Sequence, residues 1–134
     1  DTESIAKIRK AVEKAGATLK IVAPKVQIQL SDGSTLAADG QLAGTPSVLF
    51  DAVASVIPLE QGSLLSHESA AIDWFRDAFA HLKAIAACQG TRQILAAGGV
   101  EPDAGVFTPE QLNEFLQAAQ TRQWAREPKL RTLA

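Results

Sequence analysis

Segments with helical spacing of hydrophobic residues alternate along the chain with short apolar runs typical of strands. This order of segments predicts an α/β protein. Apolar residues spaced three or four apart predict helices over residues 2–16, 68–83 and 108–125. Short apolar runs predict buried strands over residues 18–23, 52–59, 84–87 and 104–107. We expect one domain over residues 1–134, a three-layer α/β sandwich with a largely parallel sheet, followed by an extended basic tail at 126–134.

A segment with strict alternation interrupts this pattern near the start of the chain. Val26, Ile28 and Leu30 alternate with polar residues, Asp32-Gly33 suits a tight turn, and residues 35–38 return. The sequence therefore predicts a small hairpin insertion at about residues 25–38. A doubly wound sheet normally begins with a strand, whereas this chain begins with a predicted helix. We therefore expect either a leading strand upstream of Asp1 or a trimmed boundary there.

The stretch from Lys83 to Gly98 carries the strongest candidate site. A buried strand is predicted to end at Cys88, and Gln89-Gly90 forms a tight corner before a helical repeat. In α/β proteins, ligands and nucleophiles gather at the carboxyl ends of such strands. The pattern therefore indicates Cys88 as the residue at which chemistry is to be sought.

Composition narrows the class of protein. With a net charge of −2 and mixed signs along the chain, nothing indicates a nucleic-acid partner or an anionic membrane. No apolar run approaches the roughly 20 residues of a membrane helix. One cysteine and two histidines exclude an intrachain disulfide and argue against a structural zinc site. The single cysteine and an opening unlike a secretory leader predict a cytoplasmic location.

Several segments, in order along almost the whole chain, carry a family resemblance. They include Ser31-Asp-Gly-Ser-Thr-Leu-Ala-Ala-Asp39 and Asp77-Ala-Phe-Ala-His-Leu-Lys-Ala-Ile85, with further segments at 11–17, 20–24, 41–53 and 122–133. These segments resemble the C-terminal domain of large-subunit monofunctional haem catalases. That domain is flavodoxin-like and similar to the class I glutamine amidotransferase and PfpI-type superfamily. The resemblance also implies that a leading strand has been lost before Asp1.

The resemblance implies a non-catalytic auxiliary domain that supports stability and oligomer packing. Its partners would be the catalase core domain and the other subunits of a homotetramer. Haem, and the disproportionation of hydrogen peroxide to water and oxygen, would belong to that core, and no cofactor or metal is expected in this chain. The sequence contains no tyrosine, so it cannot supply the tyrosinate that holds haem iron in catalases.

In PfpI-like relatives a cysteine nucleophile occupies the strand-to-helix corner, and Cys88 falls on that position by resemblance. Gln89 stands where hydrolytic relatives have a histidine, and Glu3 is an approximate counterpart of their acidic residue. A buried, inert cysteine is the competing interpretation. Two alternative functions stay open: a stand-alone PfpI-like protein using Cys88 as nucleophile or peroxide-sensing thiol, and a chaperone-like holdase.

Overall fold

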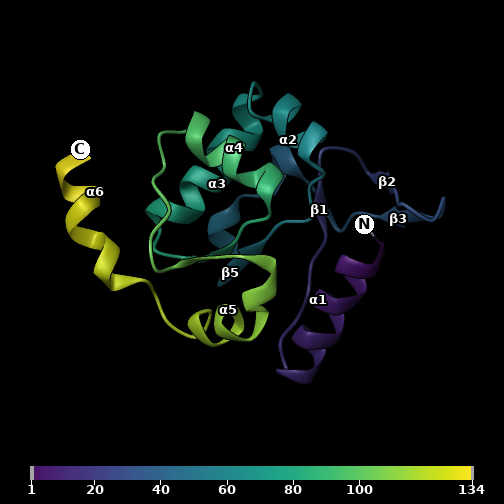
Figure 1. The fold of residues 1–134 in the computed structure, drawn as a ribbon, viewed down its shortest axis with the longest axis horizontal. Helices are drawn as coiled ribbons and strands as arrows, with labels where there is room; N and C mark the ends of the chain where they lie inside the picture. Colours follow the sequence, from purple (N-terminus) through teal and green to yellow (C-terminus); the bar gives the residue numbers. More distant parts are fainter. Residues whose placement is uncertain (1, 134) are drawn as a thin grey trace. The chain divides into compact units, whose positions relative to one another are not determined.

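The computed structural model describes residues 2–133 and shows a mixed α/β protein (Figure 1). Its internal contacts divide the chain into two compact units, with the boundary between Pro46 and Ser47. The first unit contains one helix and two small sheets, and the second contains a three-stranded parallel sheet with its helices. A single domain spanning residues 1–134 therefore stays a prediction.

The first unit begins with helix α1, Thr2–Lys14. Its apolar stripe places Ile5 and Ile8 in half-buried positions and buries Val12, as the spacing predicts. The chain then forms strand β1, Val22–Ala23, which pairs in parallel with β4, Gly40–Gln41. Strand β1 is shorter than the predicted strand at 18–23, and the short 3-10 helix η1, Leu42–Gly44, follows β4.

The predicted hairpin insertion is confirmed within this unit. Strands β2, Gln27–Gln29, and β3, Thr35–Ala37, pair antiparallel, with Ile28 directly opposite Leu36. Gly33 adopts a φ of 86° at the turn, a conformation that favours glycine. The Asp32 carboxylate accepts the Ser34 backbone N–H at 2.9 Å and closes the turn locally.

The second unit is built on a parallel sheet in the order β5-β6-β7. Its strands are β5, Ala52–Ala54, β6, Ala84–Ala86, and β7, Val106–Phe107. All three residues of the central strand β6 are buried, because neighbouring strands pair with both of its edges and side chains cover both faces. The predicted strands at 84–87 and 104–107 are confirmed, while the one at 52–59 ends at Ala54.

Helical segments precede, connect and follow these strands. The short 3-10 helix η2, Ser47–Leu49, precedes the sheet. Helix α3, Ser69–Ala80, follows the pattern predicted for 68–83 and buries Phe75 and Phe79. Helix α4 follows β6 after two residues, as predicted, whereas the sequence pattern predicts no helix at the position of α2. The remaining bounds are α2, Leu59–Leu65, α4, Gln89–Ala97, and α5, Leu112–Ala118.

Helix α5 supplies the aromatic part of the core beside the sheet. Its buried Phe115 packs with Ala84 and Ala86 and meets the Phe107 ring edge-on at 6.2 Å. The 3-10 turn η3, Pro109–Gln111, leads into this helix, and the Gln111 carboxamide oxygen accepts the Thr108 N–H at 3.0 Å. The predicted start is thus confirmed, but the helix ends at Ala118 rather than near residue 125.

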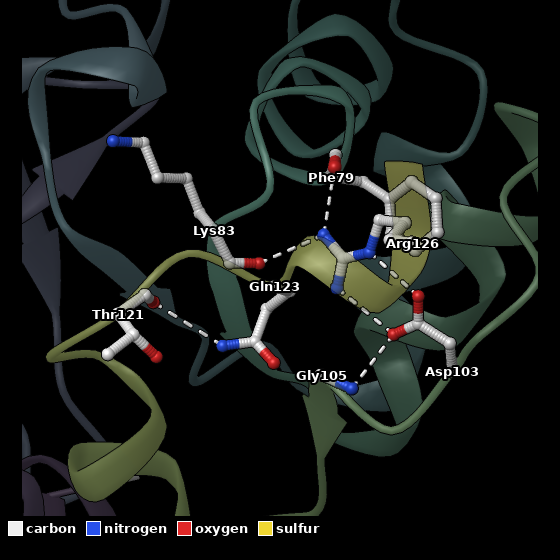
Figure 2. Close-up of polar contacts among 7 residues, drawn as sticks. All are labelled: Phe79, Lys83, Asp103, Gly105, Thr121, Gln123 and Arg126. Carbon is white, nitrogen blue, oxygen red and sulfur yellow. Dashed lines mark hydrogen bonds and ion pairs between the residues drawn. The ribbon is translucent and has the colours of Figure 1, made fainter. Parts of the chain in front are cut away.

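The tail that the sequence predicts to be extended is helical in residues 127–133, so that prediction was wrong there. A 3-10 turn η4, Trp124–Arg126, precedes α6, Glu127–Leu133, and residue 134 lies outside the described residues. Pro128 falls in the first turn of α6, where proline is compatible with a helix. The side chain of Arg126 is buried and anchors the start of this tail (Figure 2).

Candidate functional site

Cys88 lies at the corner between β6 and α4, as predicted. It precedes the first residue of α4 and keeps an extended backbone, with φ −72° and ψ 173°. The residue is half-buried, whereas the strand before it is fully buried. Its sulphur therefore sits where the central parallel strand ends, the place at which α/β proteins usually present reactive groups.

The sulphur is surrounded by neutral polar groups. The Ile57 backbone N–H donates to Sγ at 3.3 Å, and the thiol can donate to the Ile57 carbonyl oxygen at the same distance. Thr91 Oγ1 lies 3.3 Å from Sγ and Ser55 Oγ lies 3.7 Å from it. Thr91 Oγ1 also donates to Ser55 Oγ at 2.6 Å, and Ser55 Oγ in turn donates to the Ala86 carbonyl at 3.1 Å.

These contacts pull the pKa of Cys88 in opposite directions. Burial raises the pKa of the thiol, whereas hydrogen bonds from the Thr91 hydroxyl and the Ile57 N–H lower it, and the net pKa lies below the ordinary value. The Thr91 hydroxyl has only one hydrogen, which now goes to Ser55. Stabilising a thiolate therefore requires this hydroxyl to turn from Ser55 toward the sulphur.

Two glycines let the backbone close around this corner. A Cβ on Gly62 of α2 would collide with the backbone of Gly90 in α4, so the two helices pack backbone to backbone. A Cβ on Gly90 would likewise lie 2.6 Å from the Ile57 carbonyl oxygen and 2.8 Å from that of Pro58. This close approach lets α2 pack directly against α4 and brings the Ile57 backbone near the corner, where its N–H reaches the sulphur.

The other two predicted site residues, Gln89 and Glu3, are not among the groups that contact the Cys88 sulphur within the second unit. Gln89 is exposed, and no hydrogen bond joins it to the sulphur among residues 2–133. Glu3 belongs to α1 in the first unit, where its carboxylate lies 3.8 Å from the Lys7 ammonium. Among the described residues of the second unit, no imidazole or carboxylate contacts the sulphur, so this unit by itself supplies no general base. A nucleophilic role of Cys88 stays a prediction.

Sequence reasoning missed the two hydroxyl partners of the thiol. Thr91 follows Cys88 by three residues on one helix, a spacing that places it on the same face and could have indicated it. Ser55 follows a different strand, 33 residues away, and no spacing signal connects it to Cys88.

The described part of the chain shows neither a candidate metal-binding group nor a candidate membrane-spanning helix. Within residues 2–133, no three His, Cys, Asp or Glu side chains gather in a group able to hold a metal ion. Of the helices there, none has the length and apolar character needed to cross a membrane.

Comparisons with known proteins place this geometry in context. A family model described as the C-terminal domain found in long catalases matches residues 1–124. "Catalase C" of Rhizobium meliloti (strain 1021) is 35% identical over 128 residues, which cover 90% of this chain and 18% of that protein. "Catalase-B" of Dictyostelium discoideum is 28% identical over 137 residues, covering 97% of this chain and 20% of that protein. The chain thus spans about a fifth of the length of these relatives.

A solved structure supports the fold. The ThiJ/PfpI domain protein from Brachyspira murdochii superposes with a TM-score of 0.70 at 16% sequence identity, covering 89% of this chain and 87% of that one. The similarity confirms the flavodoxin-like α/β fold expected from the sequence.

Proposed function

The chain belongs to the family of C-terminal domains found in long catalases, and from this premise we propose that it is a non-catalytic auxiliary domain of a catalase. The family match over residues 1–124 is the observation that carries the proposal. The much greater length of the curated relatives supports it, because most of a catalase of that size would lie outside these residues. Peroxide disproportionation belongs, in this proposal, to that other part.

Haem does not fit the residues of this chain. Catalases hold haem iron through a tyrosine, and the sequence contains none. The Cys88 sulphur is already engaged by Ile57 and Thr91 in a corner where two helices pack backbone to backbone. Haem, and every step of peroxide chemistry, is therefore assigned to the core of the parent protein.

The surroundings of Cys88 support a domain without its own active site. Hydrolysis by a cysteine needs a neighbouring base to accept and return a proton. The hydrogen-bond partners of this sulphur are hydroxyl groups and the backbone of Ile57, none of which serves as a base near neutral pH. Thiol chemistry and holdase activity stay predictions, as does a cytoplasmic location.

We assign to the domain a role in stability and oligomer packing. Four large apolar side chains among the described residues of the second unit are exposed, and the two most exposed are Leu49 at 71% and Trp124 at 64%. Tryptophan is enriched at the centres of protein interfaces, where its ring is removed from water. Covering Trp124 with the core domain or another subunit would stabilise the assembly by burying this surface.

Truncation of the full gene product tests this role. The version that ends before Asp1 is expected to keep its peroxide turnover per bound haem, to inactivate faster on heating and to form smaller assemblies by light scattering. Loss of turnover per haem, with assembly and heat resistance unchanged, would contradict the proposal. An immunoblot of source cells that shows only a product of 14.2 kDa would also overturn it and would redirect attention to Cys88.

A point variant sharpens the experiment. Trp124→Ser in the full gene product should reproduce part of the assembly defect, because it removes the exposed ring. Asn113→Ser serves as the matched control, since Asn113 is exposed on α5 and is not apolar. Equal behaviour of the two variants would exclude Trp124 from the interface.

A further inference from the structure

A small pocket on the second unit brings two cationic side chains together. Lys83, Arg122 and Asp51 line it with Leu82 and residues 119–121, and its volume is about 90 Å³. Pockets for drug-sized ligands measure roughly 300–1,000 Å³, so this one suits a single chemical group. We call it the Lys83 pocket.

Lys83 is an unusual lining residue, because lysine is seldom so little exposed. It is only 5% exposed, and among residues 2–133 its ammonium has no hydrogen-bond acceptor or ion-pair partner. Figure 2 shows the amine extending away from the Arg126 network, which uses only the Lys83 carbonyl oxygen. Burial lowers the pKa of Lys83, the nearby charge of Arg122 lowers it further, and Asp51 raises it. In the described part of the chain no buried side-chain nitrogen or oxygen lacks a partner, so the Lys83 ammonium reaches solvent at the pocket, where water or an anion can serve as its acceptor.

Arg122 is held at the same pocket by one bond. Its Nη1 donates to the His81 carbonyl oxygen at 3.0 Å, and among the described residues no other hydrogen bond from its guanidinium is present. A guanidinium carries five N–H donors in a planar fork. Arg122 is therefore oriented by the protein while most of its donors stay available.

The turn that presents Lys83 departs twice from the usual pattern for a helix end. The Lys83 N–H donates to the Ala78 carbonyl at 3.0 Å, and the Leu82 N–H donates to that of Phe79 at 3.1 Å, which is a Schellman motif. Leu82 has a φ of 63°, where glycine is normally found. Lys83 occupies the next position, which is normally hydrophobic. Local rules are broken in this way mainly at functional sites.

From these observations we propose that the Lys83 pocket binds a small oxyanion, a carboxylate or phosphate group, held jointly by Lys83 and Arg122. The two cations outnumber the single carboxylate of Asp51, so the pocket has one uncompensated positive charge. An anion would replace solvent at the Lys83 ammonium and at the open fork of Arg122 and would accept charge-assisted hydrogen bonds from both. Asp51 acts in the opposite direction, because its negative charge repels the ligand.

Equilibrium dialysis of the full gene product tests this site, with inorganic phosphate and acetate as separate probes. Wild-type protein should bind one more ion per chain than Lys83→Met, or bind it at least about tenfold more tightly, as expected for one charge-assisted hydrogen bond. Binding of acetate alone would identify a carboxylate site, and binding of phosphate alone a phosphate site. Binding of both would identify a general oxyanion site. Asp51→Asn should tighten binding severalfold.

Two further measurements separate binding from folding. Lys83→Met removes an ammonium that pairs with no protein group and keeps an unbranched apolar stem, so it should melt no lower than wild type. Phosphate or acetate should raise the melting temperature of wild type alone. Arg122→Gln changes an exposed side chain and should weaken binding without unfolding the protein. Lys10→Gln, on exposed surface of α1, is the control for a lost charge and should change nothing. Equal binding by wild type and both pocket variants would overturn the proposal, as would no saturable binding of either probe.

Discussion

The Arg126 guanidinium holds the Asp103 carboxylate through two parallel hydrogen bonds, Nε to Oδ2 at 2.7 Å and Nη2 to Oδ1 at 3.0 Å (Figure 2). Its Nη1 donates to the carbonyl oxygens of Phe79, at 2.8 Å, and Lys83, at 3.0 Å. The Arg126 Cζ also lies 3.8 Å from the centre of the Phe79 ring. One side chain thus caps the negative end of α3 and fastens the tail to the rest of the second unit.

Loss of this side chain should destabilise the protein strongly. In Arg126→Ala, the largely buried Asp103 carboxylate loses its partner, and the free energy of unfolding should fall by about 3–5 kcal/mol. Arg76→Ala is the matched control, because Arg76 pairs with Asp73 at 3.9 Å on exposed surface and should contribute less than about 1 kcal/mol. Urea denaturation measures both, and equal losses would contradict a special role for Arg126.

The same pair predicts a loss of stability in acid. Burial raises the pKa of Asp103, but hydrogen bonds from Arg126 and the Gly105 N–H lower it more, so the folded pKa lies below 3.8. The stabilisation is therefore fully present above about pH 3.8 and is lost as the pH falls through the folded pKa. The difference in unfolding free energy between wild type and Asp103→Asn should shrink over that range. A difference that stays constant with pH would refute this linkage.

At position 82 a glycine variant should be more stable than an alanine variant, the reverse of the usual order. Both Leu82→Ala and Leu82→Gly remove a buried side chain, but only glycine relieves a positive φ. Leu82→Gly should therefore be more stable than Leu82→Ala by about 1 kcal/mol. At Leu95, buried inside α4, the same two substitutions should rank in the ordinary order, alanine above glycine. Thermal unfolding of the four variants decides the matter, and the same order at both positions would count against strain at Leu82.

The contact between α2 and α4 should not tolerate a methyl group. Gly62→Ala places a Cβ against the Gly90 backbone, which cannot move as a flexible side chain can, and should lower stability by about 1–3 kcal/mol. Gly44→Ala is the control, because its Cβ would meet open space. Circular dichroism melting curves measure the effect, and matching curves for the two variants would show that the helices separate easily.

Thr91 should control the acidity of the Cys88 thiol. Thr91→Val removes the hydroxyl that lies 3.3 Å from the sulphur and should raise the pKa of Cys88. Thr91→Ser keeps a hydroxyl and should leave the pKa closer to that of wild type. The pH dependence of thiol alkylation reports the pKa in each protein. An unchanged profile in Thr91→Val would show that the other hydrogen-bonding groups, the Ser55 hydroxyl and the backbone, set the acidity of the thiol.

The local sequence pattern was sufficient to predict the elements that are stabilised by residues close together in the sequence. The helix at Ser69–Ala80 follows from its apolar stripe, the hairpin from alternation around Asp32-Gly33, and the start of the segment after Thr108 from its capping residues. The corner at Cys88 also follows, because a buried strand, small residues and a helical repeat occur together there. In each case the decisive interactions join residues a few positions apart.

Other features depend on contacts between residues distant in sequence, and only the tertiary structure decided them. Helix α2 packs against α4 because neither Gly62 nor Gly90 has a side chain, and the tail is anchored because Arg126 reaches Phe79, 47 residues away. The partners of Cys88 and the residues of the Lys83 pocket likewise come from separate segments. Periodicity reports which face of an element is apolar, but it does not report which distant polar group that face will meet. The sequence by itself therefore determined the fold class and the place of the corner, and packing determined the chemistry around it.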